Sequence, residues 1–258
     1  MPLHLLAFFA HPDDETILAG GTLATLAEQG VHVHYLCATR GEGGETGEPP
    51  LCSPEELGAV REQELVCAVG ALRGRSLTFL GHVDPRVGPD NELFPFTDNM
   101  VHLAGQLVAT FKQFDIHAVL THGSNGEYGH PAHVLCHQAM VTALLSLPEE
   151  VRPVMYTASA SFSAHPYPRL TNENDPAHFI LDVTSVLAKK TNAALCHRTQ
   201  NALFVRRRSE QAGRQLTVPE TIIPVEGVHR LLLAWAGEAD DPLAEVLLQA
   251  GAILSPLG

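Results

Sequence analysis

The sequence predicts a Rossmann-like, doubly wound α/β fold, in which a mostly parallel sheet has helices on both faces. Short apolar runs rich in β-branched or aromatic residues alternate along the chain with longer segments of helical periodicity. This alternation is typical of parallel strands joined by helical crossovers. Because no internal repeat or low-complexity linker divides the 258 residues, we expect one domain over residues 1–258, with 183–258 as an extension of it.

Five apolar segments have the length and composition of buried strands: Leu3–Ala10, Val31–Thr39, Leu77–Gly81, Ala118–Thr121 and Val154–Ala158. Four longer segments between or beside them have helical periodicity: Thr16–Gln29, Pro54–Leu72, Asp98–Phe114 and Pro131–Leu147. Three polar loops exceed the usual length of connections: Arg40–Ser53, His82–Thr97 and Ser161–His178. We expect such loops to form ligand sites. The extension holds one helix-like segment followed by a region of mixed pattern.

The charge balance limits the classes of partner. The chain has 16 basic and 29 acidic residues, for a formal net charge of −13, which argues against nucleic acid or an anionic membrane as the main ligand. No stretch reaches the roughly 18 uncharged apolar residues of a membrane span. The apolar N-terminal segment lacks a basic start and meets acidic residues at once, unlike a signal peptide. We therefore expect a soluble, cytoplasmic protein.

The cysteines point to the same compartment. They are odd in number, form no CxxC pair and lie mostly in apolar stretches: Cys37, Cys52, Cys67, Cys136 and Cys196. Buried reduced thiols are common in such positions. The sequence thus predicts free cysteines in a reducing cytosol.

Three carboxylates and an imidazole stand directly after the first predicted strand, in the segment His11-Pro12-Asp13-Asp14-Glu15. Open α/β sheets bind their ligands at the carboxyl ends of strands. A divalent cation would offset the cost of gathering these charges, with imidazole nitrogen and carboxylate oxygen as ligands. Alternatively, Asp13 or Asp14 caps the following helix, and Glu15 lies favourably in its first turn. The segment alone favours neither interpretation.

A second polar cluster, Tyr128-Gly129-His130-Pro131-Ala132-His133, follows the strand predicted at 118–121. Pro131 suits the first turn of a helix, from which His130 and His133 both project. His137 extends the same helix face, so an ordinary amphipathic stripe is the alternative interpretation. Because both clusters follow strands, we expect them to face each other across one crevice.

Together, the two motifs resemble the signatures of the LmbE-like, or PIG-L-type, zinc-dependent N-deacetylases. Three further pieces agree with this family in order and spacing: Thr39-Arg40-Gly41-Glu42, Arg61-Glu62-Gln63-Glu64-Leu65 and His197-Arg198-Thr199-Gln200. One departure is Ala132, where many members have Asp. The tail beyond Gln200 matches less clearly.

The resemblance implies a metal site. It assigns His11, Asp14 and His133 as the ligands of one zinc ion per chain, which agrees with the three protein ligands of catalytic zinc sites. Such a donor set also accepts other divalent ions, such as Fe²⁺, according to availability. Asp13 is implied to be the general base that takes a proton from the attacking water.

The resemblance also implies roles around the metal. His130 would stabilise developing negative charge or protonate the leaving amine, and Tyr128 resembles a tyrosine of the oxyanion pocket. Arg61 corresponds to a substrate-binding arginine. Arg40 and Glu42 lie on a loop at the same sheet edge, where we also expect contact with substrate.

The remaining polar residues carry weaker expectations. We expect His32 and His34, which share one strand face without a neighbouring carboxylate, to be structural, and His122 to be an exposed loop histidine. Asp84 and Asp90 fit turn positions better than substrate contacts. His197 and Gln200 either match a functional pattern of the family or fix a helix end against the loops.

The leading hypothesis is a zinc-dependent hydrolase that removes the acetyl group from an N-acetylglucosamine-type conjugate of small size. The alternatives are a zinc amidohydrolase acting on a non-sugar acyl amide and a non-catalytic sugar-binding or metal-binding relative. A phosphoesterase is a third possibility, although the site has ligands for one ion rather than two. Relatives in the resembling family often assemble, which makes a homo-oligomer compatible with the resemblance.

Overall fold

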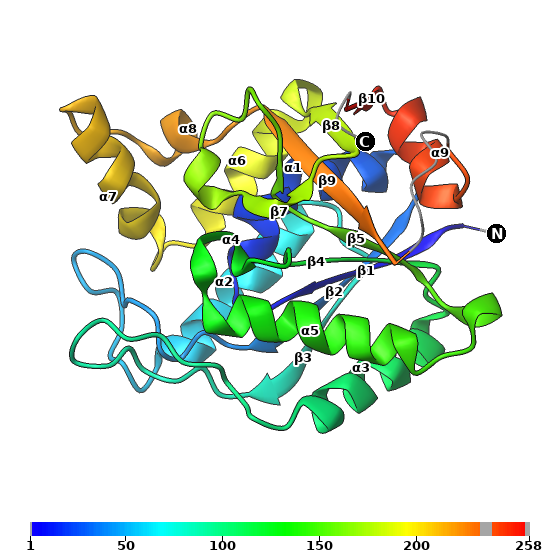
Figure 1. Cartoon of the computed structure of the whole chain (residues 1–258). Coiled ribbons are helices and arrows are strands. Elements are labelled where there is room, and N and C mark those ends of the chain that lie inside the picture. The colour runs from blue at the N-terminus through cyan, green and yellow to red at the C-terminus, as the bar shows by residue number, and fades with distance from the viewer. Residues whose placement is uncertain (1, 233–238, 256–258) are drawn as a thin grey trace.

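The computed structural model describes residues 2–232 and 239–255. Among these residues, eight strands form one sheet in the order β10-β8-β9-β5-β4-β1-β2-β3 (Figure 1). Their bounds are β1 His4–Phe9, β2 His32–Thr39, β3 Ser76–His82, β4 Ala118–Thr121, β5 Val154–Thr157, β8 Phe179–Asp182, β9 Val225–Leu231 and β10 Ile253–Leu254. A separate two-stranded sheet pairs β6 (Ala160–Ser161) with β7 (Asn172–Pro176).

The helices cover both faces of the main sheet. Their bounds are α1 Asp14–Glu28, α2 Leu57–Ala71, α3 Met100–Phe114, α4 Gly126–Gly129, α5 Pro131–Leu145, α6 Leu187–Cys196, α7 Asn201–Ala212, α8 Val218–Thr221 and α9 Pro242–Gln249. Strands β1 to β5 run parallel, whereas β9 is antiparallel to both β5 and β8. The predicted fold class is therefore confirmed.

The predicted elements of the first 160 residues are all present, with small differences at their ends. The largest is at α2, which we predicted to begin at Pro54 and which begins at Leu57. The region after 183 contains more regular structure than its sequence pattern predicts, including α6, α7 and β9. Residues 1, 233–238 and 256–258 of the predicted domain lie outside the described residues.

Alternate residues of β1 supply two separate cores, because successive side chains of a strand point to opposite faces. Leu5, Ala7 and Phe9 pack in a core that includes side chains of α1, α2, α6 and α9. Leu6 and Phe8 pack on the other face with α3 and α5, at the bottom of Figure 1. Burial on both faces is what a parallel sheet requires.

A buried ion pair joins the extension to the first helix. Lys190 Nζ of α6 lies 2.7 Å from Glu226 Oε1 of β9, and both side chains are almost fully buried. The Glu226 carboxylate also accepts hydrogen bonds from the backbone N–H groups of Gly21 and Thr22 in α1. These contacts offset the free-energy cost of burying the carboxylate.

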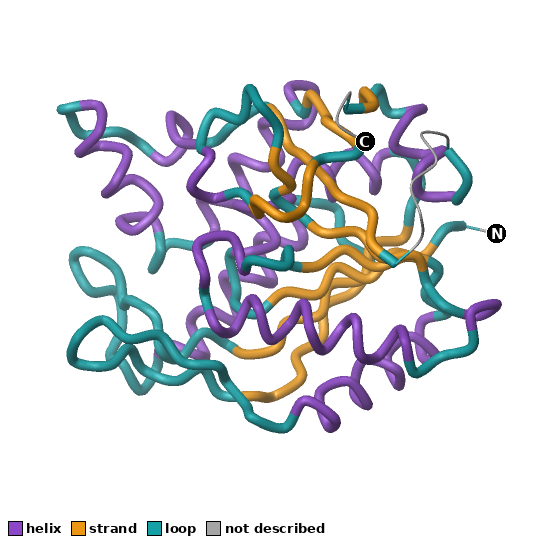
Figure 2. Tube along the Cα trace, in the orientation of Figure 1, coloured by secondary structure: helices purple, strands orange, loops and turns teal. Residues whose placement is uncertain are grey.

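The strand order reverses between β1 and β4, and the chain leaves both strands at the same edge of the sheet. Figure 2 shows the long loops gathered at the end of the molecule away from the N-terminus. Such a reversal point is where open α/β sheets form a crevice for ligands. The fold therefore brings the two sequence motifs to one place.

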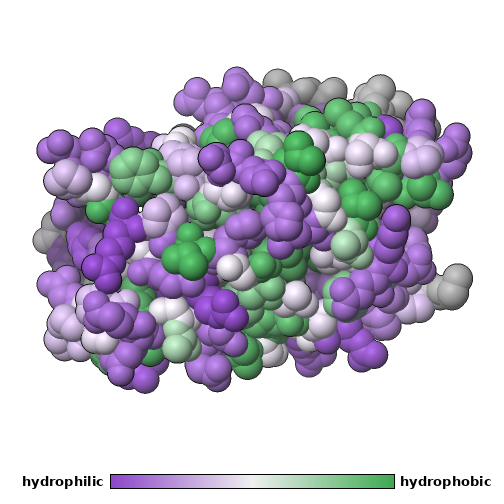
Figure 3. All heavy atoms as spheres, turned by 90° about the horizontal axis from the view of Figure 1, so that it is seen from below, coloured by the Kyte–Doolittle hydropathy of each residue, from purple (hydrophilic) through white to green (hydrophobic). Residues whose placement is uncertain are grey.

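The outer surface on one side of the molecule is largely hydrophilic. Figure 3, seen from the α3 and α5 side, shows hydrophilic side chains interspersed with smaller hydrophobic patches. Within the described part of the chain, no helix combines the length and the apolar character that crossing a bilayer demands.

The expectation of free cysteines is wrong for one pair. Cys67 on α2 and Cys196 at the end of α6 form a disulfide, with their Cα atoms 5.7 Å apart and 129 positions of sequence between them. The free cysteines are Cys37, Cys52 and Cys136, of which Cys37 and Cys136 are buried. The sequence pattern did not predict the pair because spacing along the chain does not reveal which helices pack together.

Candidate metal centre and active site

The site lies where the chain leaves β1 and β4. His11 to Asp14 lead from β1 into α1, and the segment from His122 to His133 leads from β4 through α4 into α5. The backbone of Asp13 has φ 125°, a conformation that non-glycine residues adopt rarely. Glu127 also has a positive φ, of 59°. Strained backbone of this kind collects at functional sites.

The start of α5 fixes two of the histidines. Pro131 occupies the first turn, where its missing N–H costs nothing, and His130 is the N-cap. The Nδ1 of His130 accepts a hydrogen bond from the backbone N–H of Ala132 at 3.2 Å. His133 therefore projects from the first turn, and its side chain is 1% exposed.

Asp14 stands between two histidines. Its Oδ2 lies 3.3 Å from His11 Nδ1, and its Oδ1 lies 3.3 Å from His133 Nε2. Asp14 Oδ2 also accepts a hydrogen bond from the backbone N–H of His11 at 2.9 Å. Among the described residues, His133 Nε2 is a buried nitrogen with no hydrogen-bond partner. A buried lone pair facing a carboxylate oxygen fits a metal ligand.

Glu127 is a site residue to which sequence analysis gave no role. Its Oε2 lies 2.7 Å from His133 Nδ1 and 3.0 Å from His122 Nδ1, and all three side chains are buried. Carboxylates in this position orient a ligating imidazole and fix its tautomer. The only signal in the sequence was a carboxylate in the loop that follows β4.

His122 is not an exposed loop histidine, as we had expected, but is fully buried. Its Nε2 accepts a hydrogen bond from the backbone N–H of Ala10 at 3.0 Å, so its proton lies on Nδ1, which donates to Glu127. His122 directly follows the buried strand β4, so its ring is buried beneath the site together with the side chains of that strand.

Two histidine groups in the described residues have ligand atoms close enough for a metal ion: His11 with His130 and His133, and Asp14 with His122 and His133. Backbone donors restrict both groups. The N–H of Ala132 occupies Nδ1 of His130, and the N–H of Ala10 occupies Nε2 of His122. Each of these neutral rings then carries its proton on the other nitrogen, which has no lone pair for a metal. Across the two groups this leaves His11, Asp14 and His133 as candidate donors, and neither group by itself contains all three.

The local charges shift the pKa values in opposite directions. Burial lowers the pKa of both His11 and His133, but the neighbouring carboxylates outweigh it and raise the values to about 9 and about 10. The histidines in turn hold the pKa of Asp14 well below its usual range, against the effect of burial. At His130 the balance is reversed, because burial and the nearby His133 outweigh the carboxylates and lower its pKa to about 3. This anionic pocket, ringed by imidazoles, suits a cation.

Asp13 is held beside the cluster rather than within it. Arg61 NH2 lies 3.2 Å from Asp13 Oδ2, and the same guanidinium donates to the carbonyl oxygen of Gly41 at 2.9 Å. Burial raises the pKa of Asp13 to about 6, although Arg61 opposes the shift. Arg61 is 3% exposed, so in this structure its contacts are with the protein.

The rings around His133 form the wall of the crevice. The ring of His130 stacks on that of His133 with centroids 4.5 Å apart, and the ring of Tyr128 stands edge-on to both. The centroids of His11 and His130 are 4.9 Å apart. Tyr128 is 55% exposed and thus reaches the mouth of the site. His137 faces away from the crevice and bonds through Nδ1 to the carbonyl oxygen of His122.

The two long loops approach the site differently from the sequence expectation. Asp84 Oδ1 lies 3.2 Å from His11 Nε2, so the interpretation of Asp84 as a simple turn residue is wrong. Glu42 accepts hydrogen bonds from the backbone N–H groups of Arg40 and Asp84. The Arg40 side chain bonds to Glu62 and lies over the ring of Phe79, on the far side of this loop.

His197 and Gln200 connect the extension to the site. His197 is fully buried, and its Nε2 lies 3.1 Å from Glu15 Oε1. Glu15 Oε2 accepts the backbone N–H of Asp13 at 2.9 Å. Gln200 donates to the carbonyl oxygen of Glu45 in the first long loop. These two residues thus hold the helix end against the loop and against the start of α1.

Comparison with known proteins agrees with this geometry. Residues 6–144 match the family model described as PIG-L, GlcNAc-PI de-N-acetylase. The 1D-myo-inositol 2-acetamido-2-deoxy-alpha-D-glucopyranoside deacetylase of Mycolicibacterium smegmatis is 29% identical, over 91% of each chain. A probable N-acetyl-alpha-D-glucosaminyl L-malate deacetylase 2 of Bacillus anthracis is 32% identical, over 78% of this chain and 83% of that one.

Solved structures share the fold at lower identity. The N,N'-diacetylchitobiose deacetylase of Pyrococcus horikoshii has a TM-score of 0.59 and 19% identity, covering 88% of this chain and 83% of that one. The 4-carboxy-2-hydroxymuconate hydratase of Pseudomonas putida has a TM-score of 0.60 and 21% identity, covering 92% of this chain and 99% of that one. Since one of these is a deacetylase and the other a hydratase, the fold alone does not identify the reaction.

Proposed function

Because the chain belongs to the PIG-L family, we propose that it is a zinc-dependent N-deacetylase that hydrolyses the acetamide of an N-acetylglucosamine conjugate. The observation that carries the proposal is the buried Nε2 of His133, which makes no hydrogen bond and lies 3.3 Å from Asp14 Oδ1, with a general base one residue away from Asp14. A hydrolase of this type needs both a Lewis acid and a proton acceptor next to it.

The residues present fit a zinc ion. His11, Asp14 and His133 would hold it with two imidazole nitrogens and a carboxylate oxygen, which is the composition of many catalytic zinc sites. Glu127 would keep His133 in the tautomer that presents Nε2. When bound, zinc supplies Lewis-acid polarisation of the amide carbonyl and makes a water molecule more acidic.

Asp13 would serve as the general base. Its carboxylate takes a proton from the attacking water, for which a pKa raised by burial to about 6 is suitable. Arg61 holds one carboxylate oxygen and thereby fixes the direction of the other. The hydrogen bond from the N–H of Asp13 to Glu15 holds the backbone of the base in place. Arg61 thus acts on the substrate through Asp13, whereas exposed residues at the mouth of the site would contact the substrate directly.

His130 and Tyr128 would stabilise the negative charge that develops on the amide oxygen. Since Nδ1 of His130 accepts from Ala132, its proton lies on Nε2, which can donate to that oxygen. The phenol hydroxyl of Tyr128 keeps its proton at neutral pH and can also donate. The lowered pKa of His130 favours this neutral donor.

The names of the relatives suggest the substrate class. The two curated relatives act, by name, on 2-acetamido glucosides that carry inositol or malate. We infer that this chain takes a similar α-linked glucoside with a small polar group. Asp84 and Glu42, on the loops at the mouth, would lie nearest to that group.

An assay of acetate release with purified protein tests the proposal. Wild type is expected to release acetate from N-acetylglucosaminides of inositol or malate. Asp13→Asn should keep its zinc and lose about a hundredfold to ten-thousandfold in rate, the usual contribution of a general base. Normal acetate release by this variant would exclude Asp13 as the base.

The assay also separates the other functions. Bound zinc without acetate release from any N-acetylated sugar would favour a binding protein. Hydration of a 2-hydroxymuconate, measured by the loss of its ultraviolet absorbance, would instead place the chain with the hydratase of similar fold.

A further inference from the structure

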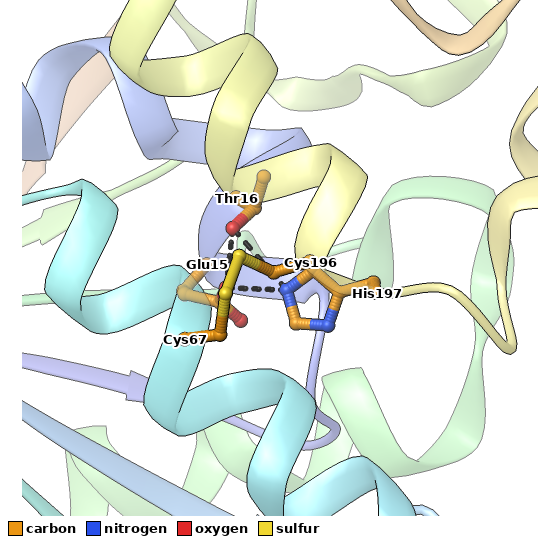
Figure 4. The surroundings of a disulfide bond; sticks show 5 residues. All are labelled: Glu15, Thr16, Cys67, Cys196 and His197. Carbon is orange, nitrogen blue, oxygen red and sulfur yellow. Dashed lines mark hydrogen bonds and ion pairs between the residues drawn. A yellow bond between two sulfur atoms is a disulfide. The ribbon is translucent and has the colours of Figure 1, made fainter.

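The disulfide between α2 and α6 lies at the surface, although its neighbours reach the active site. Cys67 is exposed, and Cys196, the last residue of α6, is partly exposed. Figure 4 shows the bond crossing between the two helices beside His197 and Glu15. Surface disulfides are the ones that small thiols attack most readily.

A pocket opens directly onto the bond. It has a volume of about 820 Å³, and both disulfide cysteines contribute to its lining. The remaining wall combines apolar side chains, such as Leu51, Val60 and Leu195, with the charged residues Glu56, Glu64 and Arg198 and the free thiol of Cys52. This volume is sufficient for a small organic molecule. The pocket is separate from the crevice that contains His11 and His133, since none of the lining residues belongs to that cluster.

We propose that this pocket is a thiol-exchange site, at which a low-molecular-weight thiol forms a mixed disulfide with Cys67 or Cys196. The thiolate attacks one sulfur, a new S–S bond forms, and the other cysteine leaves as a thiolate that takes up a proton. A second thiol then attacks the mixed disulfide. Two small thiols are oxidised to one small disulfide, and the protein disulfide is reduced to two thiols.

The bond also restrains a residue that positions the base. Cys196 is covalently followed by His197, whose Nε2 bonds to Glu15, and Glu15 holds the backbone N–H of Asp13. The same turn has a non-covalent tie, because Thr199 donates through its N–H and its hydroxyl to Glu64 of α2. Reduction therefore loosens the turn without releasing it. His197 is a positioning residue in this scheme, since it acts through Glu15.

The exchange is tested on the intact, zinc-loaded chain with 2-mercaptoethanol as the probe. After incubation and acid quenching, peptide mapping by mass spectrometry is expected to find the mercaptoethanol adduct on Cys67 or Cys196, and free thiols at both positions when the probe is in excess. A disulfide that stays intact at millimolar thiol, with no adduct, would overturn the proposal. This arm needs no substrate, so it is independent of the proposed deacetylase activity.

The effect on positioning is tested by hydrogen exchange and by kinetics. The reduced chain is expected to show faster amide exchange over residues 194–200 and 13–16, with α3 and α5 unchanged. Its kcat should fall several-fold with KM and zinc content unchanged, and this arm rests on the proposed function. Equal exchange and equal kcat in the two redox states would show that the bond does not restrain Asp13.

The double variant Cys67→Ser, Cys196→Ser is the matched control. It is expected to have the kcat and the exchange pattern of the reduced chain, and to show no response to 2-mercaptoethanol. A response of equal size in this variant would trace the effect to the metal or to Cys37, Cys52 and Cys136, and would overturn the assignment to the disulfide.

Discussion

Histidines cluster at both ends of neighbouring strands of the sheet, and the two clusters differ in what surrounds them. The cluster at the carboxyl end contains His11, His122, His130 and His133. The cluster at the amino end contains His4, His32, His34 and His117. His4 and His32 pair in register across β1 and β2. Ring centroids are separated by about the same distance in both clusters, at 4.9 Å between His11 and His130 and 5.0 Å between His4 and His32.

The presence of carboxylates distinguishes the carboxyl-end cluster of histidines from the amino-end cluster. Asp14 and Glu127 stand among the histidines of the carboxyl end and raise the pKa of His133 to about 10. At the amino end, His34 bonds to the hydroxyl of Ser76, and burial together with His4 and His32 lowers its pKa to about 4. His34, which has no carboxylate beside it, thus favours the neutral state, whereas the carboxylates beside His11 and His133 raise the pKa of both rings. The density of histidine alone does not mark a metal site.

The comparison predicts the largest effect for Asp14→Ala. This carboxylate contacts both His11 and His133, so its loss leaves a ligand set without an anion. We expect the zinc content to fall from about one ion per chain to nearly none and the rate to fall by at least about a thousandfold. Metal analysis and acetate release measure the two effects. Full zinc content in the variant would remove Asp14 from the ligand set.

Glu127→Gln should have a smaller effect, because this residue orients a ligand without being one. The variant is expected to bind zinc about 10-fold to 100-fold more weakly, measured by competition with a chelator. The amide loses the charge that both His122 and His133 contact. An unchanged zinc affinity would mean that the rest of α5 suffices to orient His133.

At the amino end, the predicted effect is on stability as a function of pH. Folded His34 stays neutral down to about pH 4, whereas an unfolded histidine titrates near 6.5. Between these values the unfolded state binds more protons, so the free energy of unfolding falls as the pH is lowered through this window. Ser76→Asp places a carboxylate beside His34 Nδ1 and should raise the pKa of His34, which reduces that fall.

Denaturant midpoints at pH 7 and pH 5, together with an NMR titration of His34, measure this change. His34→Gln is the matched control, since it removes the titrating group and should also reduce the fall. If His34 had the same pKa in Ser76→Asp as in the wild type, the claim that carboxylates distinguish the two clusters would be wrong.

The smallest effect is expected for His117→Ala. This exposed ring accepts a hydrogen bond from the backbone N–H of His4, a group that water can satisfy in its absence. We expect zinc content and kcat to stay within about twofold of wild type, and the free energy of unfolding to change by less than about 1 kcal/mol. Loss of zinc in this variant would show that the amino-end cluster holds metal too.

Most of the parallel part of the fold could be predicted from the sequence, because each of its elements has a local signal. β1 and β4 are continuous apolar runs, and α5 begins at a proline after a capping residue. The strands beyond β5 were missed. β7 consists of Asn172–Pro176, a polar segment that reads as a loop, yet its Asn172 and Asp175 are buried in hydrogen bonds with α4 and β5. Long-range pairing of this kind has no periodicity to detect.

The site could be predicted only in part for a related reason. His11, Asp14 and His133 lie in motifs at strand ends, where position and chemistry agree. Glu127 and His122 have their roles through side-chain contacts alone, and their neighbours in sequence give no sign of them. The disulfide could not be predicted for the same reason, since it depends on the packing of α2 against α6.

The carboxylate of Glu42 holds the first long loop, Arg40–Ser53, to the N–H of Asp84 in the second, His82–Thr97. This contact limits how loops can be exchanged between relatives. The backbones also touch here, because a side chain at Gly43 would meet the carbonyl oxygen of Pro85 at 2.0 Å. The two loops thus form a single structural unit. A chimera that imports one loop from a relative with another sugar conjugate would lose the fit, and substrate preference is expected to transfer only when both loops are transplanted together.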